Sequence, residues 1–220
     1  MAAVSPAIQD YLKACYRLAE ERAPVTMTRL AAALDVAAPS VTNMVKRMEG
    51  LRLVRRESES GIALTAHGRA VALEVIRHHR LLETFLVNEL GMDWADAHKE
   101  AEVLEHYISE RLEALLDKRL ARPASDPHGE PIPRIDGKVA ERRPPSLLDH
   151  PVDSIVTIAR VESQEPDLLH YLQEHGLVPG AKVRIAGIAP FNGPVAVEVG
   201  RRAHHISREV AACIAGVKKR

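Results

Sequence analysis

The sequence changes its hydrophobic pattern once, and a proline-rich stretch separates the two parts. Up to about Leu120, apolar residues recur at the spacing of helices, whereas from Val152 onwards they alternate as in strands. Between these parts, residues 122–151 hold repeated prolines and many charges, a composition that disfavours regular helices and strands. The sequence therefore predicts a mainly α fold with a small β domain, joined by a linker over residues 125–151.

The first 68 residues follow the order of a winged helix-turn-helix domain. A helical pattern runs from Ala7 to Glu21, and two short helices separated by a tight turn follow between Thr28 and Met48. In residues 51–64, branched apolar residues flank a polar tip, as in a β-hairpin. Helix, helix, helix and hairpin is the winged-helix order, so we expect residues 1–68 to bind DNA.

The second of the two short helices lies in a local excess of basic charge. The whole chain has 30 basic and 30 acidic residues, so a contact with phosphates has to come from a local patch. Residues 39–56 hold five basic side chains against Glu49 alone. We expect the start of this helix to meet base edges and its later residues to meet phosphates. The predicted DNA contacts are Pro39, Ser40, Thr42, Asn43, Lys46 and Arg47. The alternative is a small α domain whose helices simply face water.

Residues 69–124 are predicted to form a helical hairpin. One amphipathic helix runs to about Leu90 and breaks at Gly91, and a second runs from Trp94 to about Leu120. Together they carry more apolar surface than one small domain buries, which favours a homodimer.

The two long helices also carry clustered histidines and carboxylates. In a continuous helix, His98, Glu102, Glu105 and His106 fall within roughly a 100° arc, and His79 lies one turn before Glu83 on the preceding helix. Facing imidazoles and carboxylates can hold a divalent cation, because the ion offsets the repulsion between the acidic groups. The alternative is a pair of solvated helix faces.

Other functional classes find less support in the sequence. The segment Glu102–His106 lacks the first histidine of an HxxEH zinc-peptidase motif, and HExxH is absent, so we expect no enzyme. Cys15 and Cys213 lie far apart, which excludes a disulfide framework and a zinc ribbon, and Cys15 has core spacing. Aromatic residues make up 3% of the chain, which disfavours a stacking-based single-strand binder. Without a membrane-spanning run or a signal segment, we expect a soluble, cytoplasmic protein.

Residues 152–220 are predicted to form a small barrel. The pattern alternates over Val152–Val161, becomes helical over Pro166–His175 and turns at Gly176–Gly180. Strand-like segments then follow at Lys182–Ala189, Val195–Val199 and Ile206–Val217.

These motifs resemble the diphtheria toxin repressor family of metal-dependent regulators over nearly the whole chain. The similarity is carried by Pro39–Thr42, His78–Glu83, His98–Glu102 with Glu105–His106, and the loop Pro127–Pro133. The Gly176–Gly180 turn is similar to the SH3-like domain of the iron-responsive members. The resemblance implies a winged helix, a helical metal-binding and dimerisation domain, and an SH3-like tail.

The resemblance also implies two metal sites per chain. The primary site would comprise Asp10, Glu102, Glu105 and His106. The ancillary site would use His79, Glu83 and His98, completed from the barrel by Glu165 or, in its place, by Asp167 or His170.

The implied ligands favour manganese over iron. Iron-type members carry a methionine and a cysteine where this chain has Asp10 and Glu102, and oxygen ligands suit Mn(II) better than thiophilic metals. The manganese branch has a further carboxylate where this chain has Lys13, which argues against a carboxylate-bridged metal pair. The implied function is a homodimeric, Mn(II)-activated repressor that binds an inverted-repeat operator and controls manganese uptake. The alternatives are an Fe(II)-dependent repressor, a metal-independent ligand-responsive regulator and a metallohydrolase.

Overall fold

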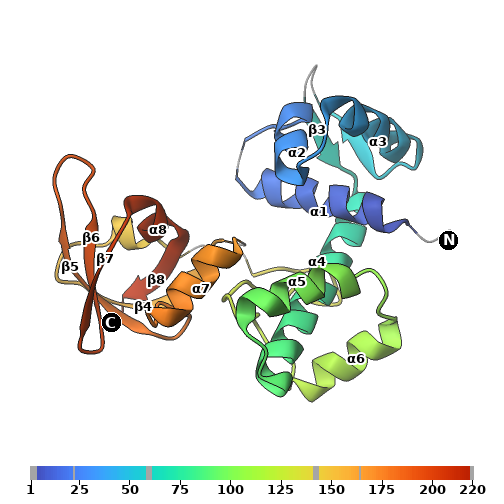
Figure 1. Cartoon of the computed structure of the whole chain (residues 1–220). Helices are drawn as coiled ribbons and strands as arrows, with labels where there is room; N and C mark the ends of the chain where they lie inside the picture. Colours follow the sequence, from blue (N-terminus) through green and yellow to red (C-terminus); the bar gives the residue numbers. More distant parts are fainter. Residues whose placement is uncertain (1–3, 22, 58–60, 141–143, 164, 219–220) are drawn as a thin grey trace. The chain divides into compact units, whose positions relative to one another are not determined.

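The computed structural model describes residues 4–21, 23–57, 61–140, 144–163 and 165–218. These residues form eight α-helices and two β-sheets, which confirms the predicted class of a mainly α protein with a small β domain (Figure 1). The chain divides into two compact units. The first comprises Met1–His79, Glu105–Ile108 and Pro133–Lys138, and the second comprises Arg80–Leu104, Ser109–Ile132 and Val139–Arg220. The long helix α4 (Ala66–Leu90) contributes to both units.

The first unit contains the predicted winged helix. Its elements are α1 (Pro6–Glu20), β1 (Val25–Thr26), α2 (Met27–Leu34), α3 (Ala38–Gly50), β2 (Val54–Arg56) and β3 (Gly61–Leu64). The three strands form an antiparallel sheet in the order β1-β3-β2. Thr26 caps α2 by accepting from the Arg29 backbone N–H, and Asp35 ends it in the left-handed region at φ 50°. Part of the predicted polar tip, residues 58–60, lies outside the described residues.

Apolar side chains of the three helices form the core of this domain. Ile8 and Leu12 of α1, Leu30 of α2, and Val41 and Val45 of α3 are all buried. Cys15 is buried as well, as its spacing predicted, and burial raises the pKa of its thiol to about 12.

The junction between the winged helix and α4 requires a glycine. The Thr65 hydroxyl accepts from the Gly68 backbone N–H at 3.0 Å and donates to the Arg52 carbonyl at 2.7 Å. A Cβ at Gly68 would lie 1.9 Å from the Leu53 carbonyl oxygen. The first turn of α4 therefore packs directly against backbone.

The prediction of one continuous helix from Trp94 to Leu120 is wrong. The structure has α5 (Trp94–Leu104) and α6 (Glu110–Arg119), with a turn between them. Ser109 caps α6 by accepting from the Leu112 backbone N–H at 3.3 Å. Glu105 and His106 consequently leave the helix face on which His98 and Glu102 lie, and they belong to the first unit.

The second unit holds the β domain. Its elements are the 3-10 turn η1 (Leu147–Asp149), β4 (Ile155–Val161), α7 (Pro166–Glu174), β5 (Lys182–Ile188), β6 (Val195–Val199), β7 (Arg202–Ile206), α8 (Arg208–Cys213) and β8 (Ile214–Lys218). The five strands are antiparallel in the order β7-β6-β5-β4-β8. The closing segment, predicted as one strand from Ile206 to Val217, is in fact the end of β7, then α8, then β8.

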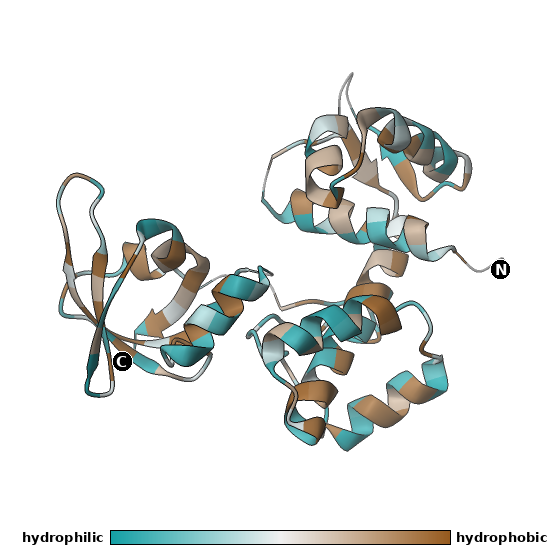
Figure 2. Cartoon of the chain, in the orientation of Figure 1, coloured by the Kyte–Doolittle hydropathy of each residue, from teal (hydrophilic) through white to brown (hydrophobic). Residues whose placement is uncertain are grey.

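The core of the β domain extends to α5. Val156, Ile158, Val183 and Val197 belong to the same buried cluster as Trp94. The Trp94 indole N–H also donates to the Leu169 carbonyl at 3.0 Å. Figure 2 shows apolar residues along strands and helices of this domain.

The first part of the predicted linker is a packed loop. The Ile132 backbone N–H donates to the Ala124 carbonyl, and Ser125 forms an isolated antiparallel β-bridge with Pro131. The side chains of Asp126 and His128 in this loop are buried. None of the helices that the structure describes combines the length and the apolar character of a membrane-spanning segment.

Candidate metal centres

The first candidate centre, the Asp10 centre, consists of Asp10, Glu105 and His106 in the first unit. One ligand atom from each residue lies within 4.8 Å of the others. His106 Nε2 is 3.1 Å from Asp10 Oδ1 and 3.7 Å from Glu105 Oε1. Asp10 comes from α1, whereas Glu105 and His106 come from the turn after α5, so the break in the helix makes this juxtaposition possible.

A hydrogen bond to Gln9 orients the His106 ring. Gln9 Oε1 accepts from His106 Nδ1 at 2.6 Å. In a neutral imidazole the proton is then on Nδ1, which leaves the Nε2 lone pair directed at the carboxylates. The sequence reasoning missed Gln9, whose only signal is its position next to Asp10.

Both carboxylate oxygens of Glu105 have partners inside the protein. Lys13 Nζ lies 2.5 Å from Oε1, and His79 Nδ1 lies 2.5 Å from Oε2. The Glu105 and Lys13 side chains are almost completely buried, at 0% and 6% exposure. His79, predicted as an ancillary ligand, therefore pairs with a predicted primary ligand, although it also lies one turn before Glu83 on α4.

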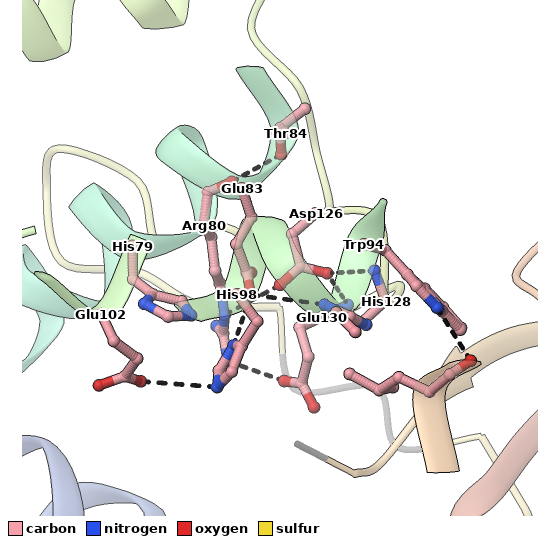
Figure 3. A network of polar contacts seen from close by, with 12 residues as sticks. His79, Arg80, Glu83, Thr84, Trp94, His98, Glu102, Asp126, His128 and Glu130 are labelled. Atoms are coloured by element: carbon pink, nitrogen blue, oxygen red, sulfur yellow. Dashed lines mark hydrogen bonds and ion pairs between the residues drawn. The ribbon is translucent and has the colours of Figure 1, made fainter. Parts of the chain in front are cut away.

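The second candidate centre, the Glu83 centre, lies in the second unit and starts from Glu83 on α4 and His98 on α5. His98 Nδ1 is 2.7 Å from Glu83 Oε1, and its Nε2 is 3.8 Å from Glu102 Oε1 (Figure 3). Glu83 and His98 are buried, and Glu102 is half-buried. The structure thus brings three predicted ligands from two neighbouring helices together.

The loop after α6 adds two side chains that the sequence reasoning did not assign to a site. His128 Nε2 lies 3.4 Å from Glu83 Oε1, and the imidazole stacks on Trp94 with ring centroids 4.9 Å apart (Figure 3). Asp126 Oδ1 accepts from the backbone N–H groups of His128 and Glu130, both at 2.9 Å. The sequence signal was the loop Pro127–Pro133, in which prolines enclose a His-Gly pair.

Opposing charges surround Asp126. The pKa of this carboxyl is raised to about 7, first by burial and then by the negative Glu83, although Arg80 and His128 act to lower it. Arg80 Nε lies 3.5 Å from Asp126 Oδ2, and its Nη2 lies 2.8 Å from Glu130 Oε2. A cation bound near Glu83 would offset the repulsion between the carboxylates there.

A second arginine ties the loop to the β domain. Arg160 on β4 lies with its Nε 2.8 Å from Glu130 Oε1. The Val161 backbone N–H donates to the His128 carbonyl at 2.8 Å. Glu130 therefore links Arg80 of α4 to Arg160 of β4.

The structure does not bring the predicted barrel residues to Glu83. Glu165 is exposed at the N-cap of α7, where its backbone N–H donates to Ser163 Oγ. Asp167 is exposed, and His170 Nε2 lies 3.1 Å from Asp93 Oδ1. In the described part of the chain, none of the three belongs to a group of ligand atoms within 4.8 Å of one another. Pro166 is the first residue of α7, so Glu165 before it occupies the N-cap position. The imidazole near Glu83 comes instead from His128 in the loop after α6.

The predicted DNA-contacting helix α3 has one exposed face. Pro39, Ser40, Asn43, Lys46 and Arg47 are exposed, whereas Thr42 is half-buried and its hydroxyl donates to the Ala38 carbonyl at 3.1 Å. The local basic charge is smaller than the sequence count, because Arg55 pairs with Glu57, which lies just outside the counted segment, while Arg56 pairs with the Glu49 already counted.

Comparisons with known proteins agree with this architecture. Residues 3–62 match the model described as iron dependent repressor, N-terminal DNA binding domain. Residues 65–134 match iron dependent repressor, metal binding and dimerisation domain, and residues 146–217 match the FeoA domain. The iron-dependent repressor IdeR of Mycobacterium leprae is 35% identical over 187 residues, which are 80% of this chain and 81% of that protein. This chain belongs to the diphtheria toxin repressor family.

Further relatives include a second curated protein and a solved structure. The diphtheria toxin repressor of Corynebacterium jeikeium is 37% identical over 161 residues, which are 71% of this chain and 67% of that protein. A solved structure titled as a manganese-dependent transcriptional repressor in complex with manganese has a TM-score of 0.88 and 34% identity, with 96% of this chain and 100% of that chain covered. As a family member, the chain is a metal-dependent, DNA-binding transcriptional repressor.

The donor set fits a divalent cation. The Asp10 centre offers two carboxylates and an imidazole, and the Glu83 centre offers carboxylates and two imidazoles. These are ligands for manganese, iron(II) or zinc, and the two cysteines lie elsewhere, Cys15 in the α1 core and Cys213 at the end of α8.

Proposed function

We propose that this family member is a manganese-activated repressor. The observation that carries the proposal is the chemistry of the Asp10 centre, whose donors are oxygens and one imidazole nitrogen without sulfur. Hard oxygen ligands suit Mn(II) relative to the later, thiophilic metals. The manganese-dependent neighbour supports this choice, whereas the relatives named iron-dependent keep Fe(II) as the alternative.

Each chain would hold up to two ions. We assign Asp10, Glu105 and His106 to the primary ion, and we keep Glu102 with them as the family resemblance implies, although its carboxylate contacts His98 of the Glu83 centre in this structure. For the ancillary ion we assign Glu83 and His98 with His79, and we add His128 and Asp126 from the loop in place of Glu165. The 3.4 Å approach of His128 Nε2 to Glu83 Oε1 supports this change, and Asp126 accepts hydrogen bonds from the backbone of the loop that carries His128.

The active form would be a homodimer on an inverted-repeat operator. Val103, Leu104, Leu112 and Leu115 of α5 and α6 are exposed large apolar residues. In a dimer with a two-fold axis through such a surface, the two winged helices point in opposite directions. The two half-sites of an inverted repeat are related in the same way, so each winged helix can bind one of them.

Metal would act through linkage. Asp10 is on α1, which packs against α2 and thus against the helix-turn-helix. An ion that joins Asp10 to Glu105 and His106 supplies the attraction that holds these carboxylates together. An ion that binds the arrangement competent for DNA binding more tightly than it binds the other arrangements shifts the population towards the competent one. Expected targets are genes of manganese uptake.

The test is a mobility shift on operator DNA, titrated with Mn(II) and with Fe(II) under anaerobic conditions. We expect binding that requires metal and is lost with chelator. Binding that is indifferent to chelator would indicate a metal-independent regulator, and hydrolysis of peptides or esters without DNA binding would indicate a metallohydrolase.

We expect Glu102→Cys to change the ranking of metals. A thiolate binds Co(II), Ni(II) and Zn(II) far better relative to Mn(II) than a carboxylate does. The variant should therefore respond to less Co(II) and to more Mn(II) than wild type, with DNA binding as the readout. Glu100→Cys, on the exposed face of the same helix, is the matched control. An unchanged ranking in Glu102→Cys would remove Glu102 from the primary ligands.

We expect Arg47→Ala to weaken binding to all DNA sequences alike. Arg47 is exposed on α3, beyond the residues at its start, and a phosphate contact carries no sequence information. The slope of log K against log salt should fall by about 1. Arg201→Ala, at an exposed turn of the β domain, should leave the slope unchanged. A changed base preference with an unaltered slope would contradict the phosphate role of Arg47.

A further inference from the structure

Two histidines of the β domain lie against each other and belong to neither candidate metal centre. His175 is the C-cap residue of α7, and His204 lies on β7, where its register partner is Val197 of β6. The ring centroids of the two imidazoles are 4.9 Å apart, with an interplanar angle of 67°. Both residues are half-buried. The function proposed above uses neither of them.

The His175 ring is held with one nitrogen available. The Tyr171 carbonyl accepts from His175 Nδ1 at 2.7 Å, and the Tyr171 ring stacks on the imidazole with centroids 4.1 Å apart. In a neutral ring the proton is then on Nδ1, and Nε2 keeps its lone pair. Metal-binding histidines are commonly oriented in this way, by a hydrogen bond from the other ring nitrogen to a backbone carbonyl.

His204 places an unpaired nitrogen beside this ring. Its Nε2 is buried and has no hydrogen-bond partner among the described residues. A buried polar atom without a partner costs free energy, and a bound ion or water removes that cost. Burial lowers the pKa of His204, and the nearby His175 and Arg202 lower it further. The imidazole is therefore largely neutral at neutral pH, and the neutral form is the one that binds metals.

We propose that His175 and His204 together bind one zinc(II) or a similar late divalent ion in the β domain. Imidazole nitrogen suits these metals, whereas Mn(II) prefers oxygen ligands such as those of the Asp10 centre. At a tetrahedral ion about 2 Å from each nitrogen, two imidazole centroids lie about 5 Å apart, which is close to the separation of this pair. Among the residues that the structure describes, neither histidine belongs to a group of three potential ligands, so water completes the coordination.

The charges near the pair act in both directions. The C-terminal end of a helix carries partial negative charge, which favours a cation beside His175 at the end of α7. Arg202, on the same strand as His204, repels a cation. Glu198 offers no compensating oxygen, because both of its carboxylate oxygens accept from Arg184. We therefore expect weaker binding than at a zinc site closed by four protein ligands.

Equilibrium dialysis of the full-length protein measures Zn(II) per chain at a concentration that saturates wild type. His175→Gln and His204→Gln should each bind one Zn(II) fewer than wild type, and the double variant should lose no more than either single variant. His205→Gln is the matched control, because His205 is exposed and its side chain leaves the opposite face of β7. It should bind as much Zn(II) as wild type. Counting differences cancels any Zn(II) bound at the Asp10 and Glu83 centres.

Arg202→Gln tests the pair without changing a ligand. Arg202 is exposed, and loss of its charge should tighten Zn(II) binding at this site by about two- to fivefold. In wild type, long-range proton–nitrogen NMR spectra should show the His204 Nε2 resonance shift during the Zn(II) titration. This measurement needs no variant to fold, and circular dichroism checks the folding of the variants.

Equal Zn(II) counts in wild type, His175→Gln and His204→Gln would overturn the proposal, and water would then be the partner of His204 Nε2. A His205→Gln variant that loses the same ion would also overturn it, since the ion would then lie on the other face of β7. Neither result bears on the proposed function, because no residue of the Asp10 or Glu83 centre takes part in this site.

Discussion

Replacing Glu105 by glutamine is expected to lower the free energy of unfolding by about 3–5 kcal/mol, because it removes the buried carboxylate charge that faces the buried Lys13 ammonium. The Glu105 side chain has 0% exposure and the Lys13 side chain 6%, so water cannot replace the lost partner in the folded state. The same change removes a carboxylate from the Asp10 centre, so DNA binding should no longer respond to Mn(II). Urea unfolding followed by circular dichroism measures the first effect, and a mobility shift measures the second.

The double variant Lys13→Met/Glu105→Gln separates these two effects. It removes both charges, and the glutamine amide can still pair with His79. We expect most of the lost stability to return, since replacing a buried ion pair by uncharged groups is often neutral. The metal response should stay absent. A double variant as unstable as Glu105→Gln would show that the Lys13–Glu105 pair is not the cause of the loss.

Gly129→Ala is expected to displace the loop that carries Asp126 and His128. A Cβ at this position would lie 2.0 Å from the Ala159 carbonyl oxygen and 2.8 Å from the Arg160 Cα, and Gly129 has φ +84°. Left-handed strain costs about 1–2 kcal/mol and overpacking about 1–3 kcal/mol more. Trp94, the only tryptophan, stacks on His128, so its fluorescence should change together with a lower unfolding midpoint.

Gly180→Ala is the matched control for the clash. Gly180 has φ +89°, but a Cβ there would meet nothing within 4 Å. It should therefore show the cost of backbone strain alone, with unchanged Trp94 fluorescence. Equal effects of the two substitutions would mean that the contact of Gly129 with β4 does not hold the loop in place.

The winged helix and the class of fold were predictable because each local signal agreed with the final structure. Pro39 at the start of α3, Gly91 after α4 and the alternating pattern of β4 each mark an element that local sequence specifies. Such consistency between propensity and fold makes sequence reasoning dependable.

The geometry of the candidate metal centres was predictable only in part, because it depends on non-local contacts. Glu102–Ser109 contains neither glycine nor proline, so the end of α5 at Leu104 had no strong local signal apart from the Ser109 cap. In a continuous helix, Glu105 shares a face with His98, and this is what the sequence pattern predicts. His128 was missed because it reaches Glu83 from a loop 45 residues further along the chain, a contact that helical periodicity cannot predict.

The presence of Trp94 in the core of the β domain has a consequence for the evolution and engineering of such chains. The barrel cannot be exchanged as a separate segment, because Trp94, one of the largest side chains in its core, precedes the proline-rich segment in the sequence. A shorter protein that ended before η1 would expose the indole and leave its N–H without the Leu169 carbonyl. Gain or loss of the tail therefore has to be accompanied by change at position 94.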